Sequence, residues 1–332
     1  MKKGRASFSE AILLSIVIPC YNAYGLMGKC LAFFEDNYRD DVEIIVVDDC
    51  STDSSFANLQ EYVASSKTNI RLFQNTTNLG PGLSRNRGIE EARGKYITFL
   101  DADDYFESNL YDVIIHEFEK DIDMLVCDYK TKSSNGNERK HSSFFSNQRE
   151  GRVAPEDAIV FLRGTTCCKF YRLSIVKDTG IRFLSQKRCE DIPFTKCITA
   201  FCKNIIYSKQ PLYCYVQIEN SLMHQSELSD PENAKRGFAY IKEVIGGIFP
   251  LQVEALFAIE CLLSTALTNI KKMKRKEWYD YVTRTECLYP AYRINPYVKK
   301  YDKLRRMVLL LIHFRCYNLL LVYLKVKAYI KG

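Results

Sequence analysis

A short apolar run that ends abruptly in acids constrains this chain more than any other feature. Residues 96–100 read YITFL and are followed by Asp101, Ala102, Asp103 and Asp104. Such a run predicts a buried central strand, and open α/β sheets bind ligands where the carboxyl ends of these strands meet. Asp101 and Asp103 are separated by a single residue. Two carboxylates at this spacing suit Mg²⁺ or Mn²⁺, which take oxygen ligands from carboxylates, water and phosphates. The run therefore predicts a site for a metal and a diphosphate, with a solvated acidic turn that caps the next helix as the alternative.

The composition is that of an ordinary globular protein. The 332 residues are 47% hydrophobic and 26% charged, which suits one large domain with an appendage, or two domains. The thirteen cysteines are scattered and include no C-x-x-C pair, so they indicate neither a disulfide framework nor a zinc site. We expect reduced thiols in a cytosol.

The net charge of +7 comes from the end of the chain. Residues 303–332 contain seven Lys or Arg residues and no acid, so the first 302 residues are neutral overall. This asymmetry argues against a nucleic-acid-binding body and for a basic tail with a partner of its own. The two apolar runs in the tail, 307–314 and 316–324, are shorter than the roughly 18 to 20 residues of a spanning helix. We expect peripheral contact with an anionic membrane face, with packing into the core as the alternative.

Three strand-loop-helix units precede the acidic run. The first predicted strand, residues 14–19, ends at Pro19 and leads into Tyr21 and Asn22. The loop contains neither the G-x-G-x-x-G fingerprint of dinucleotide sites nor the G-x-x-x-x-G-K-[ST] phosphate loop. An aromatic residue in place of glycines indicates a surface on which a base can stack.

The second and third units also place polar groups after their strands. Residues 42–47 end in Asp48 and Asp49, whose carboxylates can accept from a base N–H or a ribose hydroxyl, whereas capping of the next helix by its polar residues is the alternative. Residues 70–73 lead through a turn-rich loop to a helix with Arg85 in its first turns. An arginine there can reach phosphate oxygens.

The chain after the acidic run alternates strands and helices before it becomes helical. Residues 130–151 are polar and without periodicity, which predicts a mobile insertion or lid. A helix is predicted to begin at Glu190 and Asp191, where a helix N-terminus favours acids in any case. Beyond residue 230 the pattern is helical, and we place a boundary near 225, between domains 1–225 and 226–332. Further strands are predicted at 124–127, 167–171 and 212–216, and a helix at 110–118.

The order of these motifs resembles glycosyltransferase family 2. The resemblance covers residues 12–225 and rests on SIVIPCYN, IIVVDDCSTD, the loop at Gly80 before SRNRGIEEARGKYITFLDADD, and CEDIPF. It implies the GT-A fold, a Rossmann-like, mostly parallel mixed α/β sheet flanked by helices, here with a helical C-terminal region. It also implies transfer of a sugar from a nucleotide donor with inversion at the anomeric carbon.

The resemblance also implies roles for individual residues. Asp103 would bind the metal and Asp191 would be the catalytic base. Asp49 would accept from a pyrimidine N–H, and Arg85 and Asn86 match the family's A-R-N motif except that Ser84 replaces alanine. Nucleotide-sugar contacts are expected from Pro19, Tyr21, Asn22, Asp49, Arg85, Asn86, Asp101 and Ala102. Possible further site residues are Asp48, Glu190, Lys169, Arg172 and His224, the last as a metal ligand or else a surface histidine.

The expected function is transfer from a nucleotide sugar, UDP-linked in the first instance, to a hydroxyl of a glycan or lipid-linked acceptor. Mg²⁺ or Mn²⁺ would be the cofactor, and the product would belong to a surface polysaccharide. A non-catalytic sugar-nucleotide-binding scaffold or a nucleotidyltransferase-like enzyme is the alternative. The first would have lost an acid from the metal or base position, and the second would carry a glycine-rich basic loop after its first strand.

Overall fold

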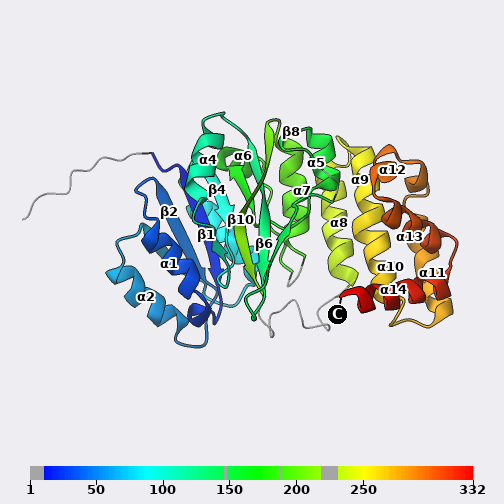
Figure 1. The fold of residues 1–332 in the computed structure, drawn as a ribbon, viewed down its shortest axis with the longest axis horizontal. Coiled ribbons are helices and arrows are strands. Elements are labelled where there is room, and N and C mark those ends of the chain that lie inside the picture. The colour runs from blue at the N-terminus through cyan, green and yellow to red at the C-terminus, as the bar shows by residue number, and fades with distance from the viewer. Residues whose placement is uncertain (1–10, 146–147, 187–188, 218–230, 332) are drawn as a thin grey trace, which may run out of the picture.

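The computed structural model describes residues 11–145, 148–186, 189–217 and 231–331. A mixed sheet stands at one end of the molecule and the C-terminal helices stand at the other (Figure 1). The strands are β1 Leu14–Cys20, β2 Val42–Asp48, β3 Ile70–Gln74, β4 Tyr96–Phe99, β5 Tyr105–Phe106, β6 Met124–Lys132, β7 Glu138–His141, β8 Gly151–Val153, β9 Lys169–Arg172 and β10 Ile205–Val216.

Helices flank the sheet and then form the C-terminal region. Those before residue 218 are α1 Gly28–Asp36, α2 Ser55–Ser65, α3 Pro81–Glu91, α4 Leu110–Phe118, α5 Pro155–Phe161, α6 Leu173–Asp178 and α7 Asp191–Phe201, with a 3₁₀ turn η1 at Tyr24–Leu26. Those after it are α8 Pro231–Ile245, α9 Pro250–Leu256, the π-helical turn η4 Phe257–Leu263, α10 Ser264–Asn269, α11 Arg275–Glu286, the 3₁₀ turn η5 Tyr292–Ile294, α12 Pro296–Lys300, α13 Lys303–His313 and α14 Tyr317–Lys331.

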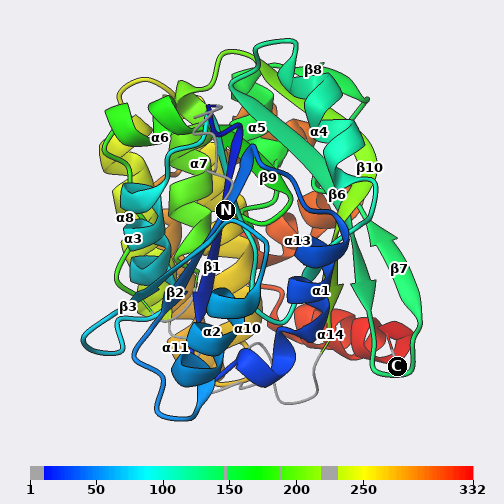
Figure 2. The same ribbon diagram turned by 90° about the vertical axis from the view of Figure 1, so that its left-hand side faces the viewer.

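The sheet order is β3-β2-β1-β4-β9-β6-β10-β5. Strands β3, β2, β1 and β4 are parallel to one another, whereas β9 runs antiparallel between β4 and β6. Both faces are covered, because Ile16 and Ile18 of β1 belong to one hydrophobic cluster and Val17 to the other. Figure 2 shows α1 on one side of β1 and β2 and α3 on the other. The predicted mostly parallel mixed sheet is confirmed.

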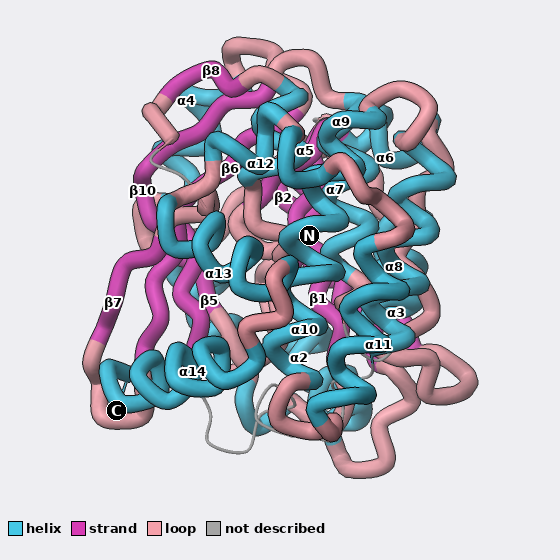
Figure 3. Tube along the Cα trace, turned by 90° about the vertical axis from the view of Figure 1, so that its right-hand side faces the viewer, coloured by secondary structure: helices cyan, strands magenta, loops and turns pink. Residues whose placement is uncertain are grey.

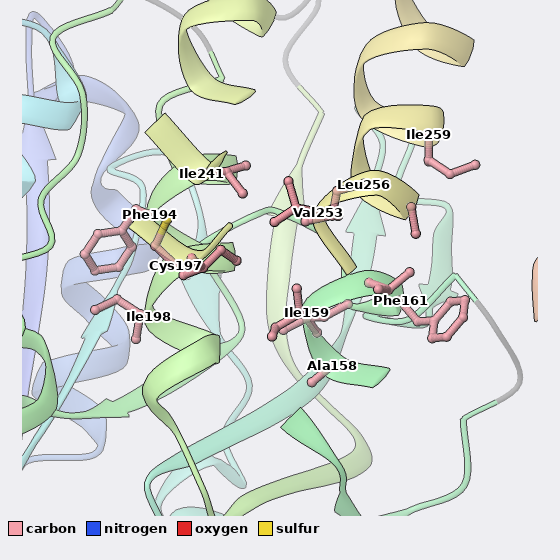
Figure 4. Packing of buried hydrophobic residues seen from close by; sticks show 14 of the residues in the cluster. Ala158, Ile159, Phe161, Phe194, Cys197, Ile198, Ile241, Val253, Leu256 and Ile259 are labelled. Carbon is pink, nitrogen blue, oxygen red and sulfur yellow. The ribbon is translucent and has the colours of Figure 1, made fainter. Parts of the chain in front are cut away.

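The C-terminal helices share a hydrophobic cluster with the sheet. Buried side chains of α5, α7, α8 and α9 meet there, and Ile241 of α8 lies beside Phe194 and Cys197 of α7 (Figure 4). The same cluster continues to Trp278 and Ile312. The predicted boundary near residue 225 lies outside the described residues, and the division into two domains stays a prediction.

The segment at residues 130–151, predicted as a mobile insertion or lid, contains strands that the sequence pattern did not predict. β6 continues to Lys132 and turns at Gly136 into β7, with β8 following. The cross-strand contacts of this hairpin include an ion pair, with Lys132 Nζ 2.8 Å from Glu138 Oε1, and the stacked rings of Tyr129 and His141. Cross-strand ion pairs stabilise a ladder without apolar alternation. The segment therefore lacks the hydrophobic pattern by which strands are recognised.

One helical run among the described residues, Pro250–Asn269, is long and apolar enough to cross a membrane. In this structure 61% of its apolar window is buried inside the protein. Burial of that kind is equally expected of a core helix.

Helix α3 approaches β1 closely at a glycine, and this contact yields a test of the packing. A Cβ added at Gly88 would lie 2.2 Å from Val17 Cγ1, whereas a Cβ at Gly25 would meet nothing within 4 Å. We expect Gly88→Ala to lower the free energy of unfolding by about 1–3 kcal/mol, since overpacking forces side chains off their rotamers. Gly25→Ala should change it by less than about 0.5 kcal/mol. Urea titration of both variants measures this, and equal stabilities would contradict the close approach.

Candidate active site

The parallel strands bring the predicted site residues to one edge of the sheet. In the ladder Cys20 pairs with Asp48, so β1 and β2 end together, whereas Phe99 at the end of β4 pairs with Val17, three residues before the end of β1. The loops with Tyr21 and Asp49 and the acids that start at Asp101 therefore leave the sheet at the same side. This is the edge at which open α/β sheets bind ligands.

Polar side chains after β1 and β2 hold the loops of this edge. Asp49 is buried, and its carboxylate accepts from the backbone N–H groups of Leu79 at 2.9 Å and Gly80 at 2.7 Å and from Asn75 Nδ2 at 2.8 Å. Asp48 accepts from Ser51 N at 3.1 Å and from Gln74 Nε2 at 3.2 Å. Both aspartates thus shape the loops, and base recognition by Asp49 stays a prediction.

The loop after β1 contains an exposed aromatic ring and a side chain that is hydrogen bonded to the next loop. Tyr21 is 46% exposed, so its ring is accessible for stacking. Asn22 has a φ of 49°, and its Oδ1 accepts from Thr52 N at 2.8 Å. Asn22 therefore ties the β1 loop to the β2 loop. Pro19, the sixth residue of β1, precedes both.

Arg85 connects the acids after β4 with the start of α7. Its buried guanidinium donates through Nη2 to Asp101 Oδ1 and through Nη1 to Glu190 Oε1, both at 2.7 Å. Burial alone would lower the pKa of Arg85, but the two carboxylates outweigh it and the pKa is raised. Arg85 therefore stays charged and fixes two acidic groups that lie 89 residues apart in the sequence.

Asn86 holds the loop that precedes α7. Its Nδ2 donates to Phe183 O at 2.9 Å, and Phe183 N donates to Asn86 Oδ1 at 2.8 Å. Phe183 in turn stacks on Phe194 of α7, with ring centroids 3.9 Å apart. In this structure the amide of Asn86 is bonded to protein backbone, so any contact with a nucleotide stays a prediction.

The three acids after β4 have different surroundings. Asp104 is fully buried and accepts from the Tyr213 hydroxyl and, at 2.8 Å, from Val216 N, so it anchors the end of β10. Burial, followed by the charge of Asp101, raises the pKa of Asp103 to about 6. Within the described residues the only hydrogen bond to the Asp103 carboxylate comes from its own backbone N–H. Ala102 is buried between these acids.

These acids fit a cation that shares its ligands with a substrate. No group of three or more His, Cys, Asp or Glu side chains that could hold a metal occurs in the described part of the chain. Asp103 has a carboxylate without a cationic partner there, and Asp101 lies beside it. Hard cations such as Mg²⁺ accept one or two carboxylates and complete their shell with water and phosphate oxygens. The donor set therefore suits a metal bound together with a diphosphate.

Asp191 is the first residue of α7 and is partly buried, with Oδ1 accepting from Ile192 N at 2.9 Å. Burial, followed by the charge of Glu190, raises the pKa of Asp191 to about 7, while Arg85 acts in the opposite direction. Glu190 is bonded to Arg85 and is therefore less available as a proton acceptor. The arrangement leaves Asp191 as a carboxylate that can gain a proton near neutral pH, which is the property of a general base.

The remaining predicted residues differ in where they lie relative to the site. Lys169 is fully buried, and its Nζ donates to Thr165 O and lies 3.4 Å from Thr165 Oγ1, so it supports the loop before β9. Arg172 pairs with Tyr96 at the opposite end of β4, about 16 Å along the strand from Asp101 at ~3.3 Å per residue. The structure does not bring Arg172 to the site. His224 lies outside the described residues.

Two site neighbours were not predicted from the sequence. Cys167 Sγ lies 3.7 Å from Asp101 Oδ2, and the Tyr213 hydroxyl lies 3.4 Å from Asp101 N. Tyr213 falls in a predicted strand, but its contact arises from antiparallel pairing of β10 with β5, which no local pattern specifies. In the sequence, the aromatic character of Tyr213 in the last predicted strand is the signal that could have indicated its place at the site.

Comparison with known proteins gives the same assignment as the geometry. The family model described as "Glycosyl transferase family 2" matches residues 15–180. The chain is 30% identical over 287 residues to a poly(ribitol-phosphate) beta-glucosyltransferase of Bacillus spizizenii, covering 81% of this chain and 44% of that protein. It is 27% identical over 212 residues to the putative glycosyltransferase EpsH of Bacillus subtilis, covering 62% of this chain and 61% of that protein. The chain thus spans less than two thirds of the length of these relatives.

A solved structure supports the fold. Residues 1–349 of TarS from Staphylococcus aureus, in complex with UDP, superpose with a TM-score of 0.69 at 21% identity, covering 92% of this chain and 88% of that one. At this identity the likeness establishes the GT-A arrangement of sheet and helices. Together with the family match and the named relatives, it places this chain in glycosyl transferase family 2, a family of glycosyltransferases.

Proposed function

We propose that the protein is a metal-dependent, inverting glycosyltransferase that moves a sugar from a UDP-linked donor to a hydroxyl of a glycan or lipid-linked acceptor in surface polysaccharide biosynthesis. The observation that carries the proposal is the Asp101–Arg85–Glu190 ion-pair chain, which sets the acids of the donor side and the candidate base Asp191 in one frame. Support for the donor comes from TarS, whose structures were solved in complex with UDP and UDP-GlcNAc. The named relative that transfers glucose to poly(ribitol-phosphate) supports a surface polymer as the acceptor.

In the proposed mechanism Asp191 removes the proton of the attacking hydroxyl. The acceptor oxygen attacks the anomeric carbon on the face opposite the leaving diphosphate, so one displacement inverts the configuration. Arg85 compensates the charge of Glu190, which lowers the pKa of the neighbouring Asp191 relative to an uncompensated pair. With a pKa of about 7, Asp191 is about half ionised at neutral pH and largely ionised above it.

Asp103, with Asp101 beside it, would hold the divalent cation. When bound, such an ion neutralises the charge that develops on the leaving diphosphate. A structural neighbour, a mannosyltransferase of Pyrobaculum calidifontis, was solved with GDP-Man and Mn²⁺, at 14% identity and a TM-score of 0.54. That neighbour supports the fold, and the fit of the ion to this chain rests on Asp103.

A non-catalytic scaffold is the weaker candidate. Asp103 and Asp191 are both present, and the pKa of each is raised by burial and a neighbouring acid. Perturbed acids of this kind cluster at functional sites. A nucleotidyltransferase-like reaction has no support in the β1 loop, where Tyr21 and Asn22 stand in place of a glycine-rich phosphate loop.

We also propose that the protein works in the cytoplasm with its tail against the anionic membrane face. Helices α13 and α14 each have one buried and one exposed apolar side, and α14 runs along the lower edge of the helical region in Figure 3. Buried Ile312 and Leu320 join the core, so both readings of the tail have support. Exposed apolar side chains are Leu304, Met307, Leu310, Phe314, Leu319, Val322 and Val326.

Replacing Asp103 tests the metal site. We expect Asp103→Ala to abolish transfer and to remove the Mn²⁺-dependent part of UDP affinity, because loss of a positioned metal costs several kcal/mol of transition-state stabilisation. Calorimetric titration with UDP, with Mn²⁺ and then with EDTA, measures the effect. The exposed acid Glu119, after α4, gives the matched control Glu119→Ala, which should behave as wild type. The same metal-dependent affinity in Asp103→Ala and wild type would refute the assignment.

Replacing Asp191 tests the base. We expect Asp191→Asn to keep UDP affinity and to lower kcat by about 10²- to 10⁴-fold, the usual contribution of a general base. In the wild type kcat/KM should rise with pH through about 7, because the base acts only as a carboxylate and burial with Glu190 raises its pKa to about 7. Steady-state kinetics between pH 5 and 9 check both. A kcat near wild type in Asp191→Asn would leave helix N-terminal stabilisation as the role of the residue.

Acidic substitutions of exposed apolar residues in α13 and just after it test membrane contact. Met307→Glu with Phe314→Glu should release the protein from phosphatidylglycerol vesicles at low salt, since it adds negative charge to a surface where each base contributes about 1 kcal/mol. Vesicle sedimentation, with phosphatidylcholine as the neutral reference, measures the loss. Ile248→Glu, which changes another exposed apolar residue, is the control and should sediment as wild type. Wild-type protein that stays in the supernatant would make the tail part of the core alone.

A further inference from the structure

A hollow lies between the loop that precedes α7 and one side of α8. Its volume is about 290 Å³, which is near the lower end of small-ligand pockets. The roles derived above for the donor and the base involve none of its lining residues. They are Leu184, Ser185 and Gln186 from the loop and Arg236, Ala239, Tyr240 and Glu243 from α8.

Gln186 is the unusual residue of this hollow. Its side chain is 8% exposed, and neither Oε1 nor Nε2 has a hydrogen-bond partner within the described residues. A primary amide has two donors and one acceptor oxygen, and leaving a buried polar group unsatisfied costs about 1–3 kcal/mol. An apolar side chain of the same size would avoid that cost. The amide therefore indicates a hydrogen-bonding ligand that is absent from this structure.

The α8 side of the hollow is built for an uncharged polar ligand. Arg236, Ala239, Tyr240 and Glu243 are spaced by three, one and three residues, which places them on one face of the helix. Ala239 leaves room, and the opposite charges of Arg236 and Glu243 offset each other. The Tyr240 hydroxyl is hydrogen bonded to the backbone of Arg182, which fixes a ring at the edge of the hollow. An aromatic ring with amide and charged groups around it can stack against a sugar ring and bond its hydroxyls.

The hollow adjoins the candidate base. Gln186 lies five residues before Asp191, the first residue of α7. A Cβ added at Gly82 of α3 would be 2.9 Å from Leu184 O and 3.0 Å from Glu190 Cγ, so the rim of the hollow and the partner of Asp191 meet the same point of α3. Phe183, held by Asn86, fixes the loop just before its rim. Leu184 at the rim of the hollow and Glu190, the residue before the candidate base, therefore both approach α3 at Gly82.

We propose that this hollow is an acceptor subsite that binds one neutral, hydroxyl-rich sugar unit next to the unit that receives the transferred sugar. Gln186 would supply hydrogen bonds to hydroxyls and Tyr240 a stacking face. The inference rests on the proposed glycosyl transfer and deepens it, since it names the acceptor as a saccharide that is recognised beyond its reacting hydroxyl. Because the charges of Arg236 and Glu243 offset each other, the hollow has no net charge that would attract a phosphodiester.

The test measures binding of neutral tetrasaccharides by saturation-transfer NMR. Cellotetraose, maltotetraose and chitotetraose serve as separate probes, and a ribitol phosphate oligomer is the charged comparison. We expect at least one tetrasaccharide to bind the wild type and to bind Gln186→Leu and Tyr240→Ala at least about 5-fold more weakly, which is about 1 kcal/mol at 1.4 kcal/mol per tenfold. UDP affinity should not change in either variant. Lys242→Ala, an exposed α8 residue outside the hollow, is the control and should bind as wild type.

Thermal unfolding separates ligand binding from a structural role of Gln186. Removing an unsatisfied amide should leave the Tm of Gln186→Leu unchanged or raise it, whereas a glutamine that supports the fold would give a lower Tm. Three outcomes would each overturn the subsite. The first is a lowered Tm with unchanged saccharide binding, the second is binding of the ribitol phosphate oligomer alone, and the third is no binding by any tetrasaccharide. Hydrolysis of a UDP-sugar without acceptor reports on the proposed function separately. If that hydrolysis persists while no tetrasaccharide binds, the subsite fails and the transferase assignment stands.

Discussion

The arrangement of this site depends on one buried cation, the guanidinium of Arg85. It lies between Asp101, which follows β4, and Glu190, which precedes α7, at 2.7 Å from each. A buried ion pair adds little net stability, because desolvation offsets much of the attraction. Its effect here is on geometry and charge: it fixes Asp101 relative to Glu190, the residue before the candidate base Asp191. Neither Asp103 nor Asp191 has a salt bridge of its own among the described residues.

Several motif residues are hydrogen bonded to other parts of the protein in this structure. Asp49 bonds the backbone before α3, Asn22 bonds the loop after β2, and Asn86 bonds Phe183 on both its N–H and its C=O. Catalysis benefits when binding groups are held in place before the substrate arrives, since the ordering cost is met in folding. Asn22 therefore supports the loop of Tyr21, and Asn86 supports the loop that precedes Asp191.

The sequence predicted the parts of this structure that rest on local patterns. Apolar runs ending in acids identify β2 and β4, and their parallel pairing brings Asp49 and Asp101 to one edge. The β6–β7 hairpin escaped prediction because its ladder pairs lysines with Glu138. Arg172 was misplaced because β9 runs antiparallel to β4, which reverses the end at which its side chain lies. Such pairings depend on tertiary contacts that no short window of residues encodes.

The C-terminal helices are connected to the site by hydrogen bonds to the end of α5. The carbonyl of Leu162, which caps that helix, accepts from the buried Lys196 of α7, and the carbonyl of Val160 accepts from the Tyr301 hydroxyl at 3.2 Å. A helix C-terminus has unpaired carbonyls and a partial negative charge, so a lysine there is favoured. The helix that begins with Asp191 and the region after α12 thus share one support. A change in the C-terminal helices can therefore reach the helix of the candidate base Asp191 through packing.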